Sequence, residues 1–483
     1  MPGETKQAWV YRSVCDLIAR GSVRRGDPLP STRALAARWG VSRGIVEIAF
    51  AQLSLEGYVA SQVGRGTEVI ADLAARARTS ADKKRAPAAP TMLAASRNDT
   101  SHPSTSGRSD AHPANPLPAN ARLVDTRLFT LRVWHRHLNR AVKEATPAML
   151  AEDDAKGHAP LRLAISRYLG MTRGILCDPS QIIVTTGIRH AIDLISKALC
   201  HGEMPVYIED PGYKTMAPLL RYTTRNLVFV PLDAEGFRVD AVDRACRPGI
   251  AFVTPAHQAP LGITMSVSRR SQLLAWATRR DMWIVEDDYD SEFSYGHAPL
   301  PALKAIDRDD RVIHCGSFNK SLFPSLRIGY MVLPAALTDR VARVRSVTGR
   351  ANSLIEQVAL THYIDAGDFA RHLRASRAVY MQRRDALLSA LRTTSAGTLA
   401  VTGEQAGFHV VLWLPQHVDE RVTVDTVLAR GVHVEGLATF SHEHAMPPAI
   451  VVGYASLDHD GIANAARVIG DAVLSATHRA NRA

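Results

Sequence analysis

Seven short apolar runs constrain the fold of residues 123–483 more than any other feature of this sequence. Their apolar residues do not alternate with polar ones, and helical patterns, such as those of residues 188–199 and 269–280, separate several of them. Short strands of this kind with helical crossovers predict a mostly parallel sheet that helices cover on both faces. The runs are residues 181–186, 205–209, 227–231, 250–254, 282–286, 311–315 and 328–333.

Lys320 stands just past the apolar run 311–315, at the kind of strand end where open α/β sheets bind ligands. Ser317 precedes it by three residues and Arg327 follows it by seven. A lysine that can be desolvated beside phosphate-binding Ser and Arg side chains is what a pyridoxal 5'-phosphate (PLP) aldimine requires. Taken alone, the stretch also suits a surface lysine in a turn, so the prediction depends on the other strand ends.

Three other strand ends carry groups that suit the remaining parts of PLP. Gly187 and Ile188 open a helix whose backbone N–H groups form an anion site for a phosphate. Tyr213 can stack on a flat ring, a carboxylate of the stretch Glu286-Asp-Asp288 can keep a pyridine nitrogen protonated, and Tyr289 can hydrogen-bond a phenolic oxygen. Each residue alone also suits a cap or a packed rim, whereas the set at successive strand ends predicts a PLP site.

Residues 1–70 show the pattern of a winged helix-turn-helix. A first helix is predicted from about residue 9, a second up to residue 39, and a third, the recognition helix, over about 43–56. Residues 57–69 then predict two short strands around a Gly-Arg-Gly tip, which would form a wing. A small helical module with a hairpin and no DNA partner is the alternative. The candidate DNA-contacting residues are Ser31, Arg33, Ser42, Arg43, Gly64 and Arg65.

The positive charge of the chain is concentrated before residue 123. The formal net charge is +11, and residues 1–122 hold +7 of it. This concentration favours an anionic partner for the amino-terminal part, which we expect to be double-stranded DNA. Residues 71–122 are rich in Ala, Pro and Ser and poor in large apolar residues, so they are predicted to form a flexible basic linker between domains at 1–70 and 123–483.

The cysteines and the hydropathy of the sequence indicate in which cellular compartment the protein works. The five cysteines, at positions 15, 177, 200, 246 and 315, show neither metal-ligand spacing nor a disulfide-like framework, which indicates a reducing cytoplasm and no metal site. The sequence has no signal peptide, and no apolar run approaches the roughly 18 residues of a membrane helix. A membrane partner is therefore not expected.

Two families share these motifs. Residues 1–70 resemble the DNA-binding domain of the GntR superfamily, and residues 123–483 resemble the fold type I aminotransferase domain. The whole chain is thus similar to MocR/GabR-type transcription regulators, which implies a small α+β C-terminal subdomain and a head-to-tail homodimer. The matching segments are Leu29-Pro-Ser-Thr-Arg33, Gly40-Val-Ser-Arg43, Glu56-Gly-Tyr58, Gly64-Arg-Gly-Thr67, Thr254-Pro-Ala-His-Gln258 and Glu286-Asp-Asp-Tyr-Asp-Ser-Glu-Phe293.

The resemblance also implies a role for each cofactor residue. It makes Lys320 the aldimine lysine and places Asp287 at the pyridine nitrogen, with Asp288 as the alternative acid. The other implied contacts are Tyr289 at the ring oxygen, Tyr213 on the ring face, and Ser317, Arg327 and the backbone of Gly187 and Ile188 at the phosphate.

One departure from the family pattern bears on the small-molecule effector. Val451 stands where aminotransferases and amino-acid-sensing relatives carry the arginine that clamps a substrate carboxylate. Valine cannot replace a bidentate guanidinium contact. Arg189 or His257 is a speculative substitute. We therefore expect a sensor rather than an enzyme, and its effector to be PLP itself, which we favour slightly, or an amine without the usual carboxylate. Two alternatives are an active aminotransferase with an accessory DNA-binding module and a regulator whose PLP domain is only a dimerisation scaffold.

The recognition helix generates a prediction for DNA binding. Arg43→Ala should lower both the affinity and the sequence preference, by about 1–3 kcal/mol, whereas Arg65→Ala should lower mainly the affinity because a wing arginine contacts phosphates or the minor groove. Titration of both variants against a mapped operator and an unrelated duplex measures the two effects. Unchanged operator binding by Arg43→Ala would show that the recognition helix is assigned wrongly.

Overall fold

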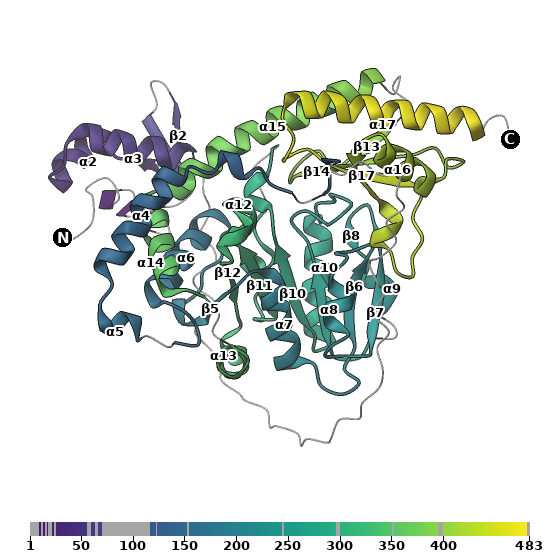
Figure 1. The fold of residues 1–483 in the computed structure, drawn as a ribbon. Helices are drawn as coiled ribbons and strands as arrows, with labels where there is room; N and C mark the ends of the chain where they lie inside the picture. The colour runs from purple at the N-terminus through teal and green to yellow at the C-terminus, as the bar shows by residue number, and fades with distance from the viewer. Residues whose placement is uncertain are drawn as a thin grey trace. The chain divides into compact units, whose positions relative to one another are not determined.

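The computed structural model of the chain contains two compact units, Met1–His112 and Pro113–Ala483, each of which is described by itself (Figure 1). The wing tip with Gly64 and Arg65, and most of the predicted linker, lie outside the described residues. The structure describes residues 9–10, 13–14, 17, 22–23, 26–55, 59–62, 66–69, 116–121, 123–151, 154–243, 246–295, 300–349, 352–394 and 399–480.

The first unit contains a helix-turn-helix and a small antiparallel sheet. α2, Thr32–Trp39, begins after Ser31, whose hydroxyl accepts a hydrogen bond from the Ala34 N–H at 3.2 Å, and it ends at Gly40 in the left-handed conformation. α3, Arg43–Leu55, follows. The predicted winged helix-turn-helix is confirmed. Its sheet has the order β1-β3-β2, with β1 at Pro28–Leu29, β2 at Val59–Gln62 and β3 at Gly66–Val69.

An eight-stranded sheet forms the centre of the second unit, in the order β5-β12-β11-β10-β9-β6-β7-β8. From β11 through β10, β9 and β6 to β7 the strands run parallel, whereas β12 is antiparallel to both neighbours and β8 to β7. The seven apolar runs correspond to seven of these strands, so the mostly parallel sheet is confirmed. The strands are β5 (Ile182–Thr185), β6 (Val206–Asp210), β7 (Leu227–Asp233), β8 (Gly236–Phe237), β9 (Ile250–Val253), β10 (Trp283–Asp288), β11 (Val312–Ser317) and β12 (Gly329–Val332).

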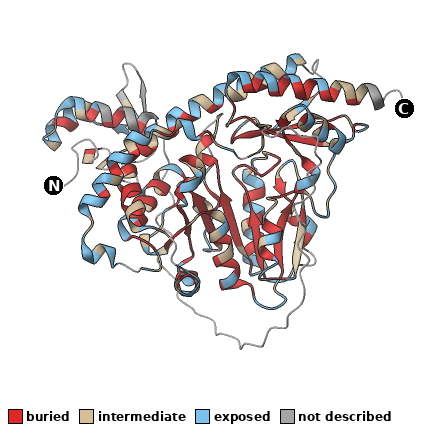
Figure 2. Ribbon diagram, in the orientation of Figure 1, coloured by how far each residue is buried: buried red, intermediate tan, exposed pale blue. Residues whose placement is uncertain are grey.

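Helices cover both faces of this sheet, and most of its strands are buried, whereas β7 is mostly half-buried (Figures 1 and 2). Val285 of β10 packs on one face with α7, α8 and α13, whereas its neighbour Ile284 packs on the other with α9 and α10. Burial on both faces explains why the strands lack polar alternation. The helices are α4 (Leu131–Glu144), α5 (Pro147–Leu150), α6 (Ala159–Thr172), α7 (Ile188–Leu199), α8 (Met216–Leu220), α9 (Val239–Val242), α10 (Val267–Arg279), α11 (Leu303–Ile306), α12 (Phe318–Ser321), α13 (Ala335–Thr348) and α14 (Leu354–Asp365).

The carboxyl-terminal part of the second unit is the small α+β subdomain that the family resemblance implies. An antiparallel sheet of order β13-β14-β17-β16 packs with helices α15 to α17, and α15 lies beside α17 (Figure 1). The elements are α15 (Asp368–Thr394), β13 (Ala400–Thr402), β14 (His409–Trp413), α16 (Glu420–Ala429), β16 (Glu435–Gly436), β17 (Ala449–Gly453) and α17 (His459–Ala480).

A short strand lies within the stretch that the sequence predicts as linker. β4, Leu117–Pro118, pairs in parallel with β15, Val432–His433. The next residue, Ala119, is buried, and its carbonyl accepts a hydrogen bond from the Gly453 N–H at 2.8 Å. The second unit therefore includes residues before 123, because Leu117–Pro118 pairs with β15 and Ala119 is buried.

Two further observations concern the described residues. Every helix among them is too short or too polar to span a bilayer. In the same part of the chain, no group of three or more His, Cys, Asp or Glu side chains is arranged to hold a metal ion.

Candidate functional site

A pocket opens at the carboxyl ends of β6, β9 and β10, the sheet edge where the sequence predicts the ligand groups. Tyr213 and Asp287, two of the predicted cofactor residues, both line it. Met216, Phe252 and Thr254 contribute to the same walls. Glu209 also lines it, and its carboxylate accepts a hydrogen bond from the Thr254 hydroxyl. The pocket thus offers an aromatic ring, apolar contacts and the Asp287 carboxylate, which suits a flat heteroaromatic ring with a basic nitrogen.

Strand geometry distinguishes Asp287 from Asp288, which the sequence left as the alternative acid. Successive side chains of β10 point to opposite faces, so Asp287 shares a face with Val285, and Asp288 shares the other with Glu286. Asp288 Oδ2 accepts a hydrogen bond from Arg173 Nε at 2.8 Å, and both side chains are buried. Asp287 is therefore the acid that faces the pocket, while Asp288 belongs to an ion pair behind it.

Two glutamates, Glu286 and Glu292, lie close to that ion pair, and their pKa values are shifted in opposite directions. Burial alone would raise the pKa of Glu286, but His314, at 2.9 Å, and Arg173 outweigh burial and hold the pKa at about 2. The pKa of Glu292 moves the other way, since burial and the neighbouring Asp288 carboxylate raise it to about 7. Near neutral pH, Glu286 is ionised and Glu292 is close to its midpoint.

Tyr289 is held by a histidine and an acid from neighbouring loops. Its hydroxyl lies 3.2 Å from His257 Nδ1, which also lies 2.8 Å from Asp290 Oδ2. All three side chains are buried. Burial alone would lower the pKa of His257, but the Asp290 carboxylate outweighs burial and raises it. His257, which the sequence suggested only as a substitute carboxylate ligand, thus orients the Tyr289 hydroxyl.

An anion-binding corner lies where β5 and β11 end on either side of β12. α7 begins at Ile188 after Gly187, which has a φ of 130°. A Cβ atom at Gly187 would lie 2.6 Å from Asn319 Nδ2 and 3.6 Å from Ser317 Oγ, so only glycine fits here. The start of α7 and the Ser317 hydroxyl therefore approach each other closely, and together they offer hydrogen-bond donors to a phosphate.

Two asparagines that the sequence analysis missed fix the loop of Arg327. Asn352 Nδ2 donates to the carbonyls of Arg327 at 2.9 Å and Thr185 at 3.1 Å. Asn319 Oδ1 accepts a hydrogen bond from the Ile328 N–H at 3.0 Å. Arg327 has a left-handed backbone, with a φ of 52°, and an exposed side chain. The closeness of Asn319 to Lys320 was its only sequence signal, and Asn352 had none.

Lys320 and Tyr213 both follow strands of the central sheet, Lys320 after β11 and Tyr213 after β6. Lys320 is partly buried in α12, directly after β11. The Tyr213 hydroxyl accepts a hydrogen bond from Arg189 Nε at 2.8 Å, and the Arg189 guanidinium lies 5.8 Å from the centre of the Tyr213 ring. Arg189 is therefore placed beside the predicted stacking residue, where a guanidinium can meet an anionic group.

Val451, the residue predicted to stand in place of the carboxylate-binding arginine, lies in the sheet of the C-terminal subdomain. It is fully buried in β17, paired with Val411, and it packs in an apolar cluster with Leu261, Leu437 and Phe440. A valine in such a cluster offers no charge to a carboxylate.

The predicted DNA-contacting side chains lie near the starts of α2 and α3. Arg33, Ser42 and Arg43 are exposed, and Ser31 is exposed as the cap of α2. Arg43 Nε lies 2.7 Å from Glu47 Oε1, with both side chains about half exposed or more, at 65% and 49%. An exposed ion pair of this kind contributes little to stability, so the Arg43 guanidinium can exchange this contact for one with a DNA phosphate or base.

Comparison with known proteins assigns both units. The family of bacterial regulatory proteins called the gntR family matches residues 6–69, and aminotransferase class I and II matches residues 116–469. The chain is 34% identical over 455 residues to the probable rhizopine catabolism regulatory protein MocR of Rhizobium meliloti, covering 93% of this chain and 90% of that protein. It is 30% identical over 457 residues to the pyridoxine biosynthesis transcriptional regulator PdxR of Corynebacterium glutamicum, covering 95% and 93%.

A solved structure extends the comparison to the second unit. LysN, an α-aminoadipate aminotransferase from Thermus thermophilus complexed with N-(5'-phosphopyridoxyl)-L-leucine, superimposes with a TM-score of 0.69 at 25% identity, covering 75% of this chain and 93% of LysN. The two units together define a helix-turn-helix transcription regulator with an aminotransferase-like domain. Within that class, the chain belongs to the MocR-type regulators of the GntR superfamily.

The raised pKa of Glu292 predicts a pH-dependent stability. The contribution of its carboxyl group to stability is fully present below the ordinary pKa near 4.5 and is lost as the pH rises through about 7. The ionised form is disfavoured in the folded protein by burial and by the neighbouring Asp288 carboxylate. Glu292→Gln should therefore gain stability over the wild type between pH 5 and 8, by about 1–2 kcal/mol since Glu292 is only half-buried.

Chemical denaturation across this pH range measures the difference. Glu443→Gln, an exposed glutamate of the C-terminal subdomain, is the control and should show a difference from wild type that stays flat with pH. A flat difference for Glu292→Gln as well would contradict the raised pKa.

Proposed function

We propose that this transcription regulator holds PLP in its second unit and changes its DNA binding with the occupancy of that pocket. One observation carries the proposal: Tyr213 and Asp287 line a single pocket, while Gly187 and Ser317 form an anion-binding corner at neighbouring strand ends. The ring and the phosphate of PLP need these two kinds of site. The likeness to LysN, which was solved with a phosphopyridoxyl compound, supports the same cofactor.

The residues of the pocket have distinct tasks in this proposal. PLP supplies an electrophilic aldehyde that reacts reversibly with amines, and Lys320 is the amine that would hold it. Asp287 keeps a proton on the pyridine nitrogen, because a carboxylate in an apolar wall favours a neighbouring positive charge. Tyr289 donates a hydrogen bond towards the ring oxygen, and His257 with Asp290 fixes the direction of that hydroxyl.

The phosphate is proposed to bind where the backbone leaves room for it. We propose that the backbone of Gly187 and Ile188 contacts the phosphate at the start of α7, where the helix dipole favours an anion; the Gly187 N–H also donates to Thr185 Oγ1 at 3.2 Å. Ser317 adds a hydroxyl donor. Arg327 adds the counter-charge, and the hydrogen bonds of Asn352 hold its loop in the left-handed conformation that such a contact requires.

The buried Val451 limits the effector that the pocket can sense. A carboxylate without its bidentate arginine loses a charge-assisted pair, which is worth roughly 1.5–3 kcal/mol. We therefore propose that ordinary α-amino acids bind weakly and are not transaminated. PLP itself is the favoured effector, and the similarity to a pyridoxine biosynthesis regulator supports it. An amine without a carboxylate is the second candidate, and Arg189 beside Tyr213 would suit its anionic end.

The assembly and location follow from the same family membership. We propose a head-to-tail homodimer with two winged helices, so that paired half-sites bind more tightly than one through linked valency. A regulator that binds the chromosome and keeps its cysteines as thiols would work in the cytoplasm. Among the described residues Cys177, Cys200, Cys246 and Cys315 are free.

The cofactor proposal predicts a visible absorbance band in the purified protein after PLP is added. Lys320→Ala should lose this band and keep at most non-covalent PLP, whereas Lys197→Ala, on the exposed face of α7, should keep it. Asp287→Asn should weaken PLP binding about tenfold or more, because the pyridine nitrogen loses its charged partner. A wild-type protein that shows no band even with excess PLP would refute the proposal.

A further inference from the structure

α4 has one face buried in the second unit and one face open to solvent. On the buried face, the Trp134 ring meets the Tyr363 ring edge-on with centroids 5.7 Å apart, and His137 Nε2 lies 2.7 Å from Asp368 Oδ2. Both Trp134 and His137 are buried. These contacts fix the rotation of α4 about its axis, so the side chains opposite them must point outwards.

The outward face carries a line of basic side chains. Arg132, Arg136, Arg140 and Lys143 are all exposed, and with His135 they line one shallow hollow. Spacings of four, four and three residues keep side chains on one face of a helix. From the first to the last, the helix rises about 16 Å. We call Arg132, Arg136, Arg140 and Lys143 the α4 basic stripe.

Carboxylates neutralise only part of the stripe. Glu144 pairs with Arg140 at 2.7 Å and also lies 2.8 Å from His362 Nε2 of α14, so one acid serves two bases. Arg132 and Lys143 have no ion pair with a described residue. Arg140 is 52% exposed, and exposed ion pairs exchange readily with solvent or with another anion.

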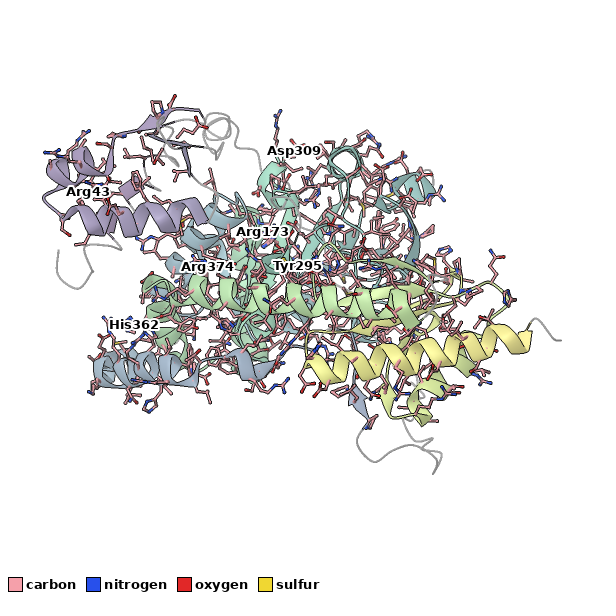
Figure 3. The ribbon with its side chains drawn as sticks, turned by 90° about the horizontal axis from the view of Figure 1, so that it is seen from above. Arg43, Arg173, Tyr295, Asp309, His362 and Arg374 are labelled. Atoms are coloured by element: carbon pink, nitrogen blue, oxygen red, sulfur yellow. The ribbon has the colours of Figure 1, made fainter. Side chains whose placement is uncertain are left out.

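The basic surface continues from α4 onto α15. Asp368, at the start of α15, lies 3.2 Å from Arg136 and 2.6 Å from Arg371, although its own side chain is almost buried. Arg136 is 66% and Arg371 is 55% exposed, so both guanidinium groups keep donors towards solvent. Arg374 is also exposed, and Figure 3 shows it on α15 on the side where His362 marks α14 next to α4.

The two helices that form this surface are both strongly basic. Residues 1–122 hold +7 of the net charge of +11, which leaves +4 for residues 123–483. α4 carries +3, with four basic residues against Glu144, and α15 carries +4, with six arginines against Asp368 and Asp385. Like charges on one helix face repel each other, so a stripe of one sign suits contact with an anion more than it suits stability.

We propose that the α4 basic stripe binds the phosphate backbone of duplex DNA, as a second contact beyond the winged helix. DNA is the polyanion that suits the gntR-family unit of this chain, and the shared chain raises its local concentration for the second unit. Arginine forks suit phosphate oxygens, and a straight stripe suits a line of phosphates. Such contacts add affinity and salt dependence without discriminating between bases.

Salt dependence of DNA binding tests the proposal, at a constant PLP concentration. The full-length variant Arg132→Gln, Arg140→Gln, Lys143→Gln is titrated with a random-sequence duplex at several salt concentrations. Each lost phosphate contact lowers the slope of log affinity against log salt by about 0.9, so the slope should fall by about 2–3. A winged-helix operator, where one is mapped, should be weakened by the same factor, leaving its preference over random DNA unchanged.

A control variant removes the same charge from elsewhere. Arg343→Gln, Arg421→Gln and Arg467→Gln, on the exposed faces of α13, α16 and α17, should leave the slope near the wild-type value. If the stripe variant unfolds, the double variant Arg132→Gln, Lys143→Gln, which breaks no ion pair of the described residues, should still lower the slope by about 1–2.

Equal slopes for the stripe and control variants would overturn the proposal. An unchanged slope together with altered sedimentation of the stripe variant would also overturn it. That result would indicate that α4 contacts a second copy of the chain. Neither outcome depends on PLP, so the result stands apart from the cofactor proposal.

Discussion

The alternation of side chains at the end of β10 is the constraint on which the pocket depends. One step along the strand turns Asp287 towards the pocket and Asp288 towards Arg173 on the opposite face. Breaking a buried ion pair of this kind costs about 3–5 kcal/mol, because the remaining charge is left without compensation. Arg173 follows α6, so the pair also ties that helix end to the strand that carries the pocket carboxylate. A one-residue slip of β10 would exchange the faces of the two acids, so that Asp288 would face the pocket and Asp287 would face away from it.

Residues behind the pocket keep its polar groups in place. His257 links Asp290 to Tyr289, and Asn352 links the end of β5 to the loop of Arg327. Each link joins segments far apart in the sequence, so the position of the Tyr289 hydroxyl and of the Arg327 backbone depends on contacts across the second unit. A sensor gains from this arrangement because a ligand that meets prearranged groups spends less of its binding energy on ordering them.

The sequence predicted the features that depend on local pattern. The unalternated runs indicated the sheet, and the Gly-containing turn with its wing indicated the winged helix, because burial and turn chemistry act over a few residues. Strand-end position also brought Tyr213 and Asp287 to one pocket. The sequence did not separate Asp287 from Asp288, since that depends on the face of β10. It also missed Asn352 and the early start of the second unit at β4, because both depend on contacts with distant segments.

The central claim is that occupancy of the pocket controls DNA binding, and one titration tests it most directly. Apo-protein is titrated with PLP while its affinity for a mapped operator and the absorbance of the bound cofactor are followed together. The account predicts that operator affinity changes about tenfold or more, with the same midpoint as the absorbance. PLP can shift the equilibrium between two conformations of the protein only by as much as its affinities for them differ, so the change in DNA binding should follow the occupancy of the pocket. Unchanged operator affinity at full PLP occupancy, together with a clear response to an ordinary amino acid at micromolar concentration, would contradict it and mean that another residue binds the amino-acid carboxylate.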